Sequence, residues 1–360
     1  MTNQISISQF CIIIVLTTGI KNLVQIVPLI LASAGRDAWI SVIVGYLLIL
    51  PFLFIWTFAN KKLVGISIFD WIEMNYSKVF RQIVVLLFVA FLLVEGFTTV
   101  METTSWTNNT YLIHTPKLVV ALAVLGSSLY ISYGKLKVVA ICGGVLIPFV
   151  IVLQIFVAIG TIKDSNYLLL LPILIENRWL DVFQGALFVF ASMAEIIILL
   201  MMLQHQIIKK VTFKHLFFLS FVIFIVTIVP VIDTIAIFGA EEALRIKYPV
   251  FLIWRILGIG EYFNHLDFLS IYQWLAGTFI RLALILYLIT NAFNMKKPLI
   301  IQMLICIFYL FLIIAPISDM QIFSFLQHYY YLSYSIFAVA VTILLFLLIK
   351  LKNRMSASDR

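Results

Sequence analysis

The chain has 360 residues, of which 64% are hydrophobic and only 11% are charged, and its mean hydropathy is +1.14. Soluble globular chains are about 25% charged, so this composition excludes an ordinary soluble domain and indicates an all-α polytopic membrane protein in a lipid bilayer. The net charge of +8 comes from Lys and Arg in short segments between apolar runs, not in one patch, so no nucleic-acid partner is indicated.

A transmembrane helix needs about 20 apolar residues, and by this rule the sequence predicts ten. The first nine residues contain no Lys or Arg, so we expect the first apolar run to be retained as a span. The predicted spans cover residues 5–31, 38–58, 81–106, 118–133, 136–162, 182–203, 216–238, 266–292, 298–315 and 329–349.

Two segments outside the spans have apolar residues at helical spacing. Residues 67–73 predict a short helix in the membrane interface. Residues 248–260 begin with Tyr248-Pro249 and predict an amphipathic helix that either covers the outer mouth as a lid or lies on the surface without a gating role. No loop is long enough for a separate soluble domain, so residues 1–360 are expected to form a single membrane domain.

The distribution of Lys and Arg predicts the orientation of the chain. With the N-terminus inside, fifteen of the 24 cations lie in cytoplasmic segments, seven lie outside, and Lys21 and Arg281 lie in the membrane. This bias predicts that both termini are cytoplasmic, with residues 350–360 as a cytoplasmic tail.

The first span carries an unusual polar run, Thr17-Thr18-Gly19-Ile20-Lys21-Asn22, in its middle. Gly and small hydroxylated residues weaken a helix, and a lysine at mid-depth costs about 3 kcal/mol on insertion scales. The run therefore predicts an interrupted helix that lines a small-molecule site. The alternative is a continuous, slightly polar helix whose Lys21 forms an ion pair for structural reasons alone.

Four charges fall near mid-depth of different spans: Lys21, Glu95, Glu195 and Arg281. Two are positive and two negative, so they are able to form a neutral set. Sequence alone does not assign the pairs, and Lys21–Glu95 and Arg281–Glu195 are both possible structural ion pairs. Glu102 follows Glu95 by seven residues, on nearly the same helix face and closer to the outer end.

The small residues before Glu195 favour close approach of another backbone. We therefore predict a ligand site between the first and sixth spans, with Glu195 contacting a ligand amine or accepting a proton. Arg281 is the expected buried charge partner, and the predicted site residues are Thr17, Thr18, Gly19, Lys21, Glu95, Ala191, Ser192 and Glu195.

No sequence motif indicates a cofactor, a metal site or an enzyme. The three Cys residues lie far apart in apolar runs, as small buried hydrophobic residues do. No zinc-protease motif, nucleophile elbow or phosphate-binding loop is present in the sequence. We therefore expect no catalytic residues, metal or cofactor.

Ten spans with the first and sixth interrupted are the plan of five-plus-five inverted-repeat transporters, in which the site lies between the two broken helices. The first repeat would cover residues 1–162 and the second residues 182–349. The sixth span has no Gly or Pro at its suspected break, so its interruption rests on its polar residues alone.

At several positions the chain resembles the B subunits of spore germinant receptors, which belong to the amino acid–polyamine–organocation superfamily. The resemblance extends from the first to the eighth span. It is carried by Gly19 with Pro28, the run Gly35-Arg36-Asp37-Ala38-Trp39-Ile40-Ser41, Leu171-Pro172, Gly185, Glu195-Ile196-Ile197, Tyr248-Pro249, Leu266-Asp267 and Trp274.

The resemblance implies a sensor of the spore inner membrane that binds an amino acid, sugar or nucleoside germinant. It also implies partnership with a larger membrane A subunit and a lipoprotein C subunit. Two other hypotheses stay open: a proton-coupled amino-acid transporter that uses Glu195 or Glu95, and a structural membrane subunit without a ligand.

Overall fold

The structure, a computed structural model, describes residues 4–60, 63, 65–258 and 266–358. Its described residues are helical apart from turns and one isolated parallel bridge between Ile5 and Ile207, which confirms the all-α prediction. The α-helices are α1 Ile7–Ile14, α2 Val27–Ala34, α3 Ala38–Asn60, α4 Ile68–Asn75, α5 Lys78–Thr110, α6 Lys117–Tyr133, α7 Lys135–Gly160, α8 Trp179–Leu203, α9 Phe213–Ala243, α10 Pro249–Ile256, α11 Phe268–Ala292, α12 Pro298–Ile314, α13 Asp319–Phe325 and α14 Tyr331–Ser358.

Each of the ten predicted spans corresponds to a helical segment. Among the described residues, seven helical runs are long and apolar enough to cross a membrane, and the first of these, Ile7–Ala59, contains two of the predicted spans. Helices α6 and α12 are apolar but have only 17 residues each, at the lower limit for a span. A multi-pass membrane protein follows from these helices, whereas the count of ten spans and the inverted repeat stay predictions.

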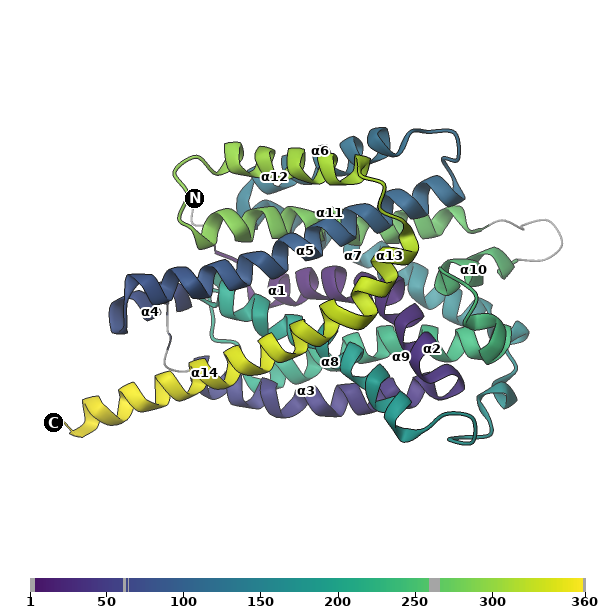
Figure 1. Cartoon of the computed structure of the whole chain (residues 1–360), viewed down its shortest axis with the longest axis horizontal. Helices are drawn as coiled ribbons and strands as arrows, with labels where there is room; N and C mark the ends of the chain where they lie inside the picture. The colour runs from purple at the N-terminus through teal and green to yellow at the C-terminus, as the bar shows by residue number, and fades with distance from the viewer. Residues whose placement is uncertain (1–3, 61–62, 64, 259–265, 359–360) are drawn as a thin grey trace.

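The long helices lie side by side in one bundle, with α8 among them (Figure 1). Every residue of α8 from Phe188 to Leu203 is buried, and the helix contacts α2, α3 and α14. A helix that is apolar on all sides is expected at such a central position. Outward-facing side chains on other helices, such as Leu86, Val145 and Phe311, are large, apolar and exposed, as a lipid-facing surface requires.

Close packing of α3 against α8 depends on Gly45. A Cβ atom at this position would lie 2.5 Å from Cβ of Val189 and 2.7 Å from the carbonyl oxygen of Ala186. The missing side chain therefore allows the two helices to approach each other closely, as small residues do between membrane helices.

The first span bends but is not unwound, which corrects the predicted interruption. Two π-helical turns, η1 Val15–Gly19 and η2 Asn22–Ile26, join α1 to α2, and α1 and α2 run in different directions (Figure 1). A π turn inserts one extra residue and keeps the backbone hydrogen-bonded, so the polar run deforms the helix without freeing a stretch of backbone in hydrocarbon. Gly19 itself is not required sterically, because a Cβ there would make an ordinary 3.5 Å contact with Val226.

The predicted interruption of the sixth span is wrong, since α8 is α-helical from Trp179 to Leu203. It has no Gly or Pro after Gly185 to weaken the helix, and its polar Ser192 and Glu195 have partners on other helices. The last span also begins earlier than expected: α13, the π-helical turn η7 Leu326–Tyr330 and α14 form one helical run from Asp319.

The two predicted amphipathic segments are helical. In α4, Ile68, Phe69 and Ile72 are buried, and in α10, Phe251, Ile253 and Trp254 are buried. Residues 259–265, which include the end of the predicted lid segment, lie outside the described residues. In Figure 1, α4 and the C-terminal end of α14 lie at one end of the bundle, and α10 and α13 lie at the other.

A cysteine added after Arg360 should be protected from a membrane-impermeant thiol reagent applied to intact cells, because the cation bias predicts a cytoplasmic C-terminus. The assay needs a background in which Cys11, Cys142 and Cys306 are replaced by Ala. Ile175→Cys is the matched control, because Ile175 is 75% exposed in the segment between α7 and α8 and is predicted to lie outside. Labelling of the C-terminal cysteine together with protection of the Ile175→Cys variant would reverse the orientation.

Candidate functional site

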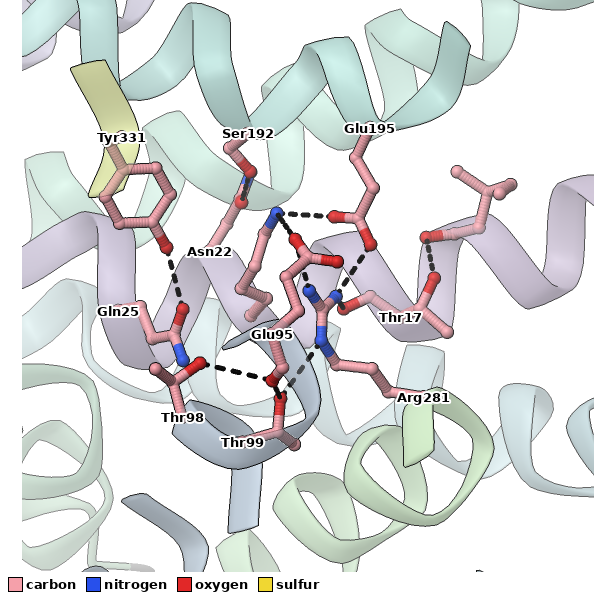
Figure 2. A network of polar contacts seen from close by, with 12 residues as sticks. Thr17, Asn22, Gln25, Glu95, Thr98, Thr99, Ser192, Glu195, Arg281 and Tyr331 are labelled. Carbon is pink, nitrogen blue, oxygen red and sulfur yellow. Dashed lines mark hydrogen bonds and ion pairs between the residues drawn. The ribbon is translucent and has the colours of Figure 1, made fainter. Parts of the chain in front are cut away.

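The four mid-depth charges meet in one buried cluster, which we call the charge cluster: Lys21, Glu95, Glu195 and Arg281 (Figure 2). Lys21 lies between η1 and η2, and the other three come from α5, α8 and α11. Each residue is at most 5% exposed. Two cations and two carboxylates balance, as the sequence predicted for a neutral set.

Both cations of the charge cluster contact both carboxylates. Arg281 places Nη2 at 2.9 Å from Oε1 of Glu95 and Nη1 at 2.9 Å from Oε1 of Glu195. The Lys21 ammonium donates to Oε2 of Glu195 and lies 3.7 Å from Oε1 of Glu95. The two pairs left open by the sequence, Lys21–Glu95 and Arg281–Glu195, therefore coexist with the two crossed pairs.

Hydroxyls and a backbone carbonyl complete the surroundings of Arg281. Its Nε donates to Thr99 Oγ1 at 3.1 Å, and its Nη1 donates to the carbonyl oxygen of Thr17 at 3.1 Å, within η1. Thr98 and Thr99 in turn donate to the carbonyl oxygen of Glu95. A buried guanidinium needs many acceptors, and this arrangement supplies them without any group from outside the chain.

A second set of hydrogen bonds fixes the π-helical turns of the first span. Ser192 donates to Asn22 Oδ1, and Asn22 Nδ2 donates to Thr227 Oγ1 of α9 at 2.8 Å. Tyr331 of α14 donates to Gln25 Oε1 at 2.7 Å (Figure 2). The sequence reasoning missed these partners, although uncharged polar residues in apolar spans are a usable signal for such bonds.

The remaining predicted site residues are packed inside the bundle. Ala191 and Thr18 are completely buried, and the Thr18 hydroxyl has no hydrogen-bond partner among the described residues. The burial of Ala191 fits the close helix packing that small residues favour.

A small cavity, which we call the inner cavity, lies beside the charge cluster. The π-helical part of the first span, α5 and α11 form its walls, whereas Ala191, Ser192 and Glu195 of α8 are not among its lining residues. The inner cavity is lined by Thr17, Ile20, Lys21, Val24, Gln25, Thr99, Glu102, Thr103, Trp274, Gly277, Thr278 and Arg281.

Two further cavities adjoin the inner cavity on the side of α10. One shares Ile20, Val24 and Trp274 with it and is lined by Phe251 and Trp254 of α10. The other shares Val24, Gln25 and Glu102 with the inner cavity and also has Lys247 and Asp319 in its lining. We call this second one the outer cavity.

Aromatic rings and one ion pair close these cavities near α10. Trp106 and Trp274 stack at 4.2 Å between ring centroids, and Phe251 packs its edge on Trp106 at 5.7 Å. Lys247 pairs with Asp319 at the start of α13. Burial raises the pKa of Tyr248, which lies between these groups, so the side chain is a neutral phenol at physiological pH. The position of α10 fits the predicted lid, while its movement with a ligand stays a prediction.

No metal site is apparent in the part of the chain that the structure describes, because no three His, Cys, Asp or Glu side chains gather there. Glu95 and Glu195 are engaged by protein cations, so their charges are already compensated. The chemistry of the charge cluster is therefore ion pairing between four helical elements.

Comparison with known proteins places the chain in a family. The pattern of the spore germination protein family matches residues 4–319. The chain is 32% identical over 333 residues to "Spore germination protein XB" of Bacillus anthracis, which covers 90% of this chain and 92% of that protein. It is 22% identical over 262 residues to "Putative spore germination protein YfkT" of Bacillus subtilis (strain 168), with 72% and 71% covered. The chain therefore belongs to the spore germination protein family.

Proposed function

We propose that the chain is the multi-spanning membrane subunit of a nutrient germinant receptor and that it binds a small germinant in the inner cavity. Family membership and the name of the Bacillus anthracis relative support a role in germination. The observation that carries the binding site is a cavity beside four buried charges that link four helical elements. Buried ionisable groups beside a cavity in a membrane protein are candidates for ligand recognition.

We assign different roles to the residues predicted from sequence. Thr17 and Lys21 line the inner cavity and are able to contact a ligand directly. Glu95 and Glu195 hold Lys21 and Arg281 in place. A ligand that contacts Lys21 or Arg281 would change the balance of ion pairs between the first span, α5, α8 and α11, which gives a physical route from binding to a change in helix packing.

The proposed receptor lies in the spore inner membrane with both termini cytoplasmic. It works with a larger membrane A subunit and a lipoprotein C subunit, as the resemblance of the sequence implies. Germination is then triggered by ligand binding, and net transport of the germinant is not required.

Binding and transport can be separated with the purified chain in liposomes. We expect saturable binding of at least one amino acid, sugar or nucleoside and no net uptake of that compound. Spores that lack the gene should lose their response to the same compound, measured as loss of optical density, and a gene copy should restore it. Saturable uptake would favour the transporter hypothesis, and absence of binding to any of these compounds would favour a structural subunit.

A further inference from the structure

One carboxylate beside the inner cavity does not belong to the charge cluster. Glu102 of α5 lines both the inner and the outer cavity. Its Oε2 atom is buried and has no hydrogen-bond partner among the described residues. Leaving a buried polar atom without a partner costs about 1–3 kcal/mol, and more for a charged group, so this atom needs an explanation.

The neighbouring polar groups are already engaged with one another. Thr103 and Thr278 share a hydrogen bond of 3.1 Å, and Trp274 Nε1 donates to Thr103 at 3.2 Å. Lys247, the cation that lines the outer cavity, is paired with Asp319, which also accepts a hydrogen bond of 2.8 Å from Ser105. These contacts do not involve Oε2 of Glu102, which has no hydrogen-bond partner among the described residues.

The charges around the two cavities do not balance. The charge cluster is neutral and the pair Lys247–Asp319 is neutral, so Glu102 is left as a carboxyl group with no cation paired to it among the described residues. Glu195 is not available to a ligand amine without the loss of contacts to Lys21 and Arg281. A cation that enters the cavities therefore meets Glu102 as the carboxyl group that is not already paired with a cation among the described residues.

We propose that Glu102 is the specificity-determining residue that recognises a positively charged group of the ligand, so that the cavities take a small molecule with an ammonium group. This inference rests on the proposed function and assigns the ligand's charged group to a residue outside the charge cluster. Glu102 lies seven residues beyond Glu95, which is about 10 Å along α5, so a ligand at Glu102 can extend toward Lys21 and Arg281 without replacing their partners.

The test is thermal stabilisation of the purified full chain by a defined panel of compounds, because a ligand that binds only the folded state stabilises it by an amount that rises with the logarithm of one plus the ratio of ligand concentration to Kd. The ammonium probes are ethylamine and the twenty protein amino acids. The probes without an ammonium group are L-lactate, D-glucose and inosine. We expect stabilisation by at least one ammonium probe and by none of the others.

Glu102→Gln should weaken binding of that ammonium probe at least tenfold, because it removes the counter-charge and keeps the size of the side chain. Glu102→Asp keeps the charge at a shorter reach and should show an intermediate loss, which tests the proposal even if the Gln variant does not fold. The matched control is Asp233→Asn, which removes a half-buried carboxylate of α9 that lines none of these cavities and should bind as the wild type does.

The possible failures can be told apart. Stabilisation by lactate, glucose or inosine alone, or ammonium binding that is unchanged in Glu102→Gln, overturns the role of Glu102 and leaves the receptor proposal standing. If no probe of either class stabilises the wild type, the ligand-binding function and the role of Glu102 both fail.

Discussion

Replacing Glu195 by Gln should strongly lower the amount of folded protein in the membrane. Glu195 contacts both Lys21 and Arg281, so its neutralisation leaves two buried cations with only Glu95 to balance them. Breaking a buried ion pair from one side typically costs about 3–5 kcal/mol, which is a large fraction of the roughly 5–15 kcal/mol by which domains are stable. Membrane abundance and the thermal stability of detergent-solubilised protein measure the loss.

A second substitution provides a charge-matched control. Lys21→Gln alone should be destabilising for the opposite reason, because it leaves two carboxylates with one cation. The double variant Lys21→Gln with Glu195→Gln retains the pair Arg281–Glu95 and should be more stable than either single variant. If the losses in stability of the two single variants simply add in the double variant, charge balance does not govern the stability of the charge cluster. Normal abundance of Glu195→Gln with a weakened ligand response would instead restore the predicted contact between Glu195 and a ligand amine.

Gly45→Ala should separate α3 from α8 and destabilise the fold by about 1–3 kcal/mol. The new methyl group would lie 2.5 Å from Cβ of Val189 and 2.7 Å from the backbone oxygen of Ala186, and backbone cannot move aside as a flexible side chain does. Because α8 is the central helix and carries Glu195, we expect a lower melting temperature and weaker ligand response together. Both are measured on purified protein.

Gly144→Ala in α7 is the control for this change. A Cβ atom at Gly144 would meet no atom within 4 Å, so the substitution adds no clash. Ala in a helix is favoured over Gly by roughly 0.5–1 kcal/mol, so this variant should be as stable as the wild type or slightly more stable. Equal stability of both variants would contradict the close contact between α3 and α8.

The class of protein and the approximate place of each span could be predicted from sequence because both depend on local hydropathy. A run of about 20 apolar residues is sufficient to predict a helix in a membrane, wherever that helix packs. The meeting of Lys21, Glu95, Glu195 and Arg281 could also be anticipated, since isolated charges in hydrocarbon need partners and two of each sign were present at similar depth.

The shape of the first span and the pairing of the charges depend on the tertiary structure. The polar run Thr17–Asn22 predicted a break, but whether a weak helix unwinds or forms π turns depends on partners such as Ser192, Thr227 and Arg281 that lie far away in the sequence. Helix α8 stays continuous for the same reason. Its polar side chains form hydrogen bonds and ion pairs with other helices, so the helix does not need to unwind.

Which residues line the cavities is also decided only by how the helices pack in the bundle. Each residue turns a helix by about 100°, so a small rotation decides whether a side chain faces a neighbour, lipid or a cavity. Position along α5 separates Glu95, engaged by Arg281, from Glu102, which lines the cavities and whose Oε2 has no hydrogen-bond partner among the described residues, although both are carboxylates on one face. Hydropathy alone therefore determined that this chain is built of membrane helices, while the rotation and contact of those helices decided which of its charges are compensated and which one is left facing the cavities.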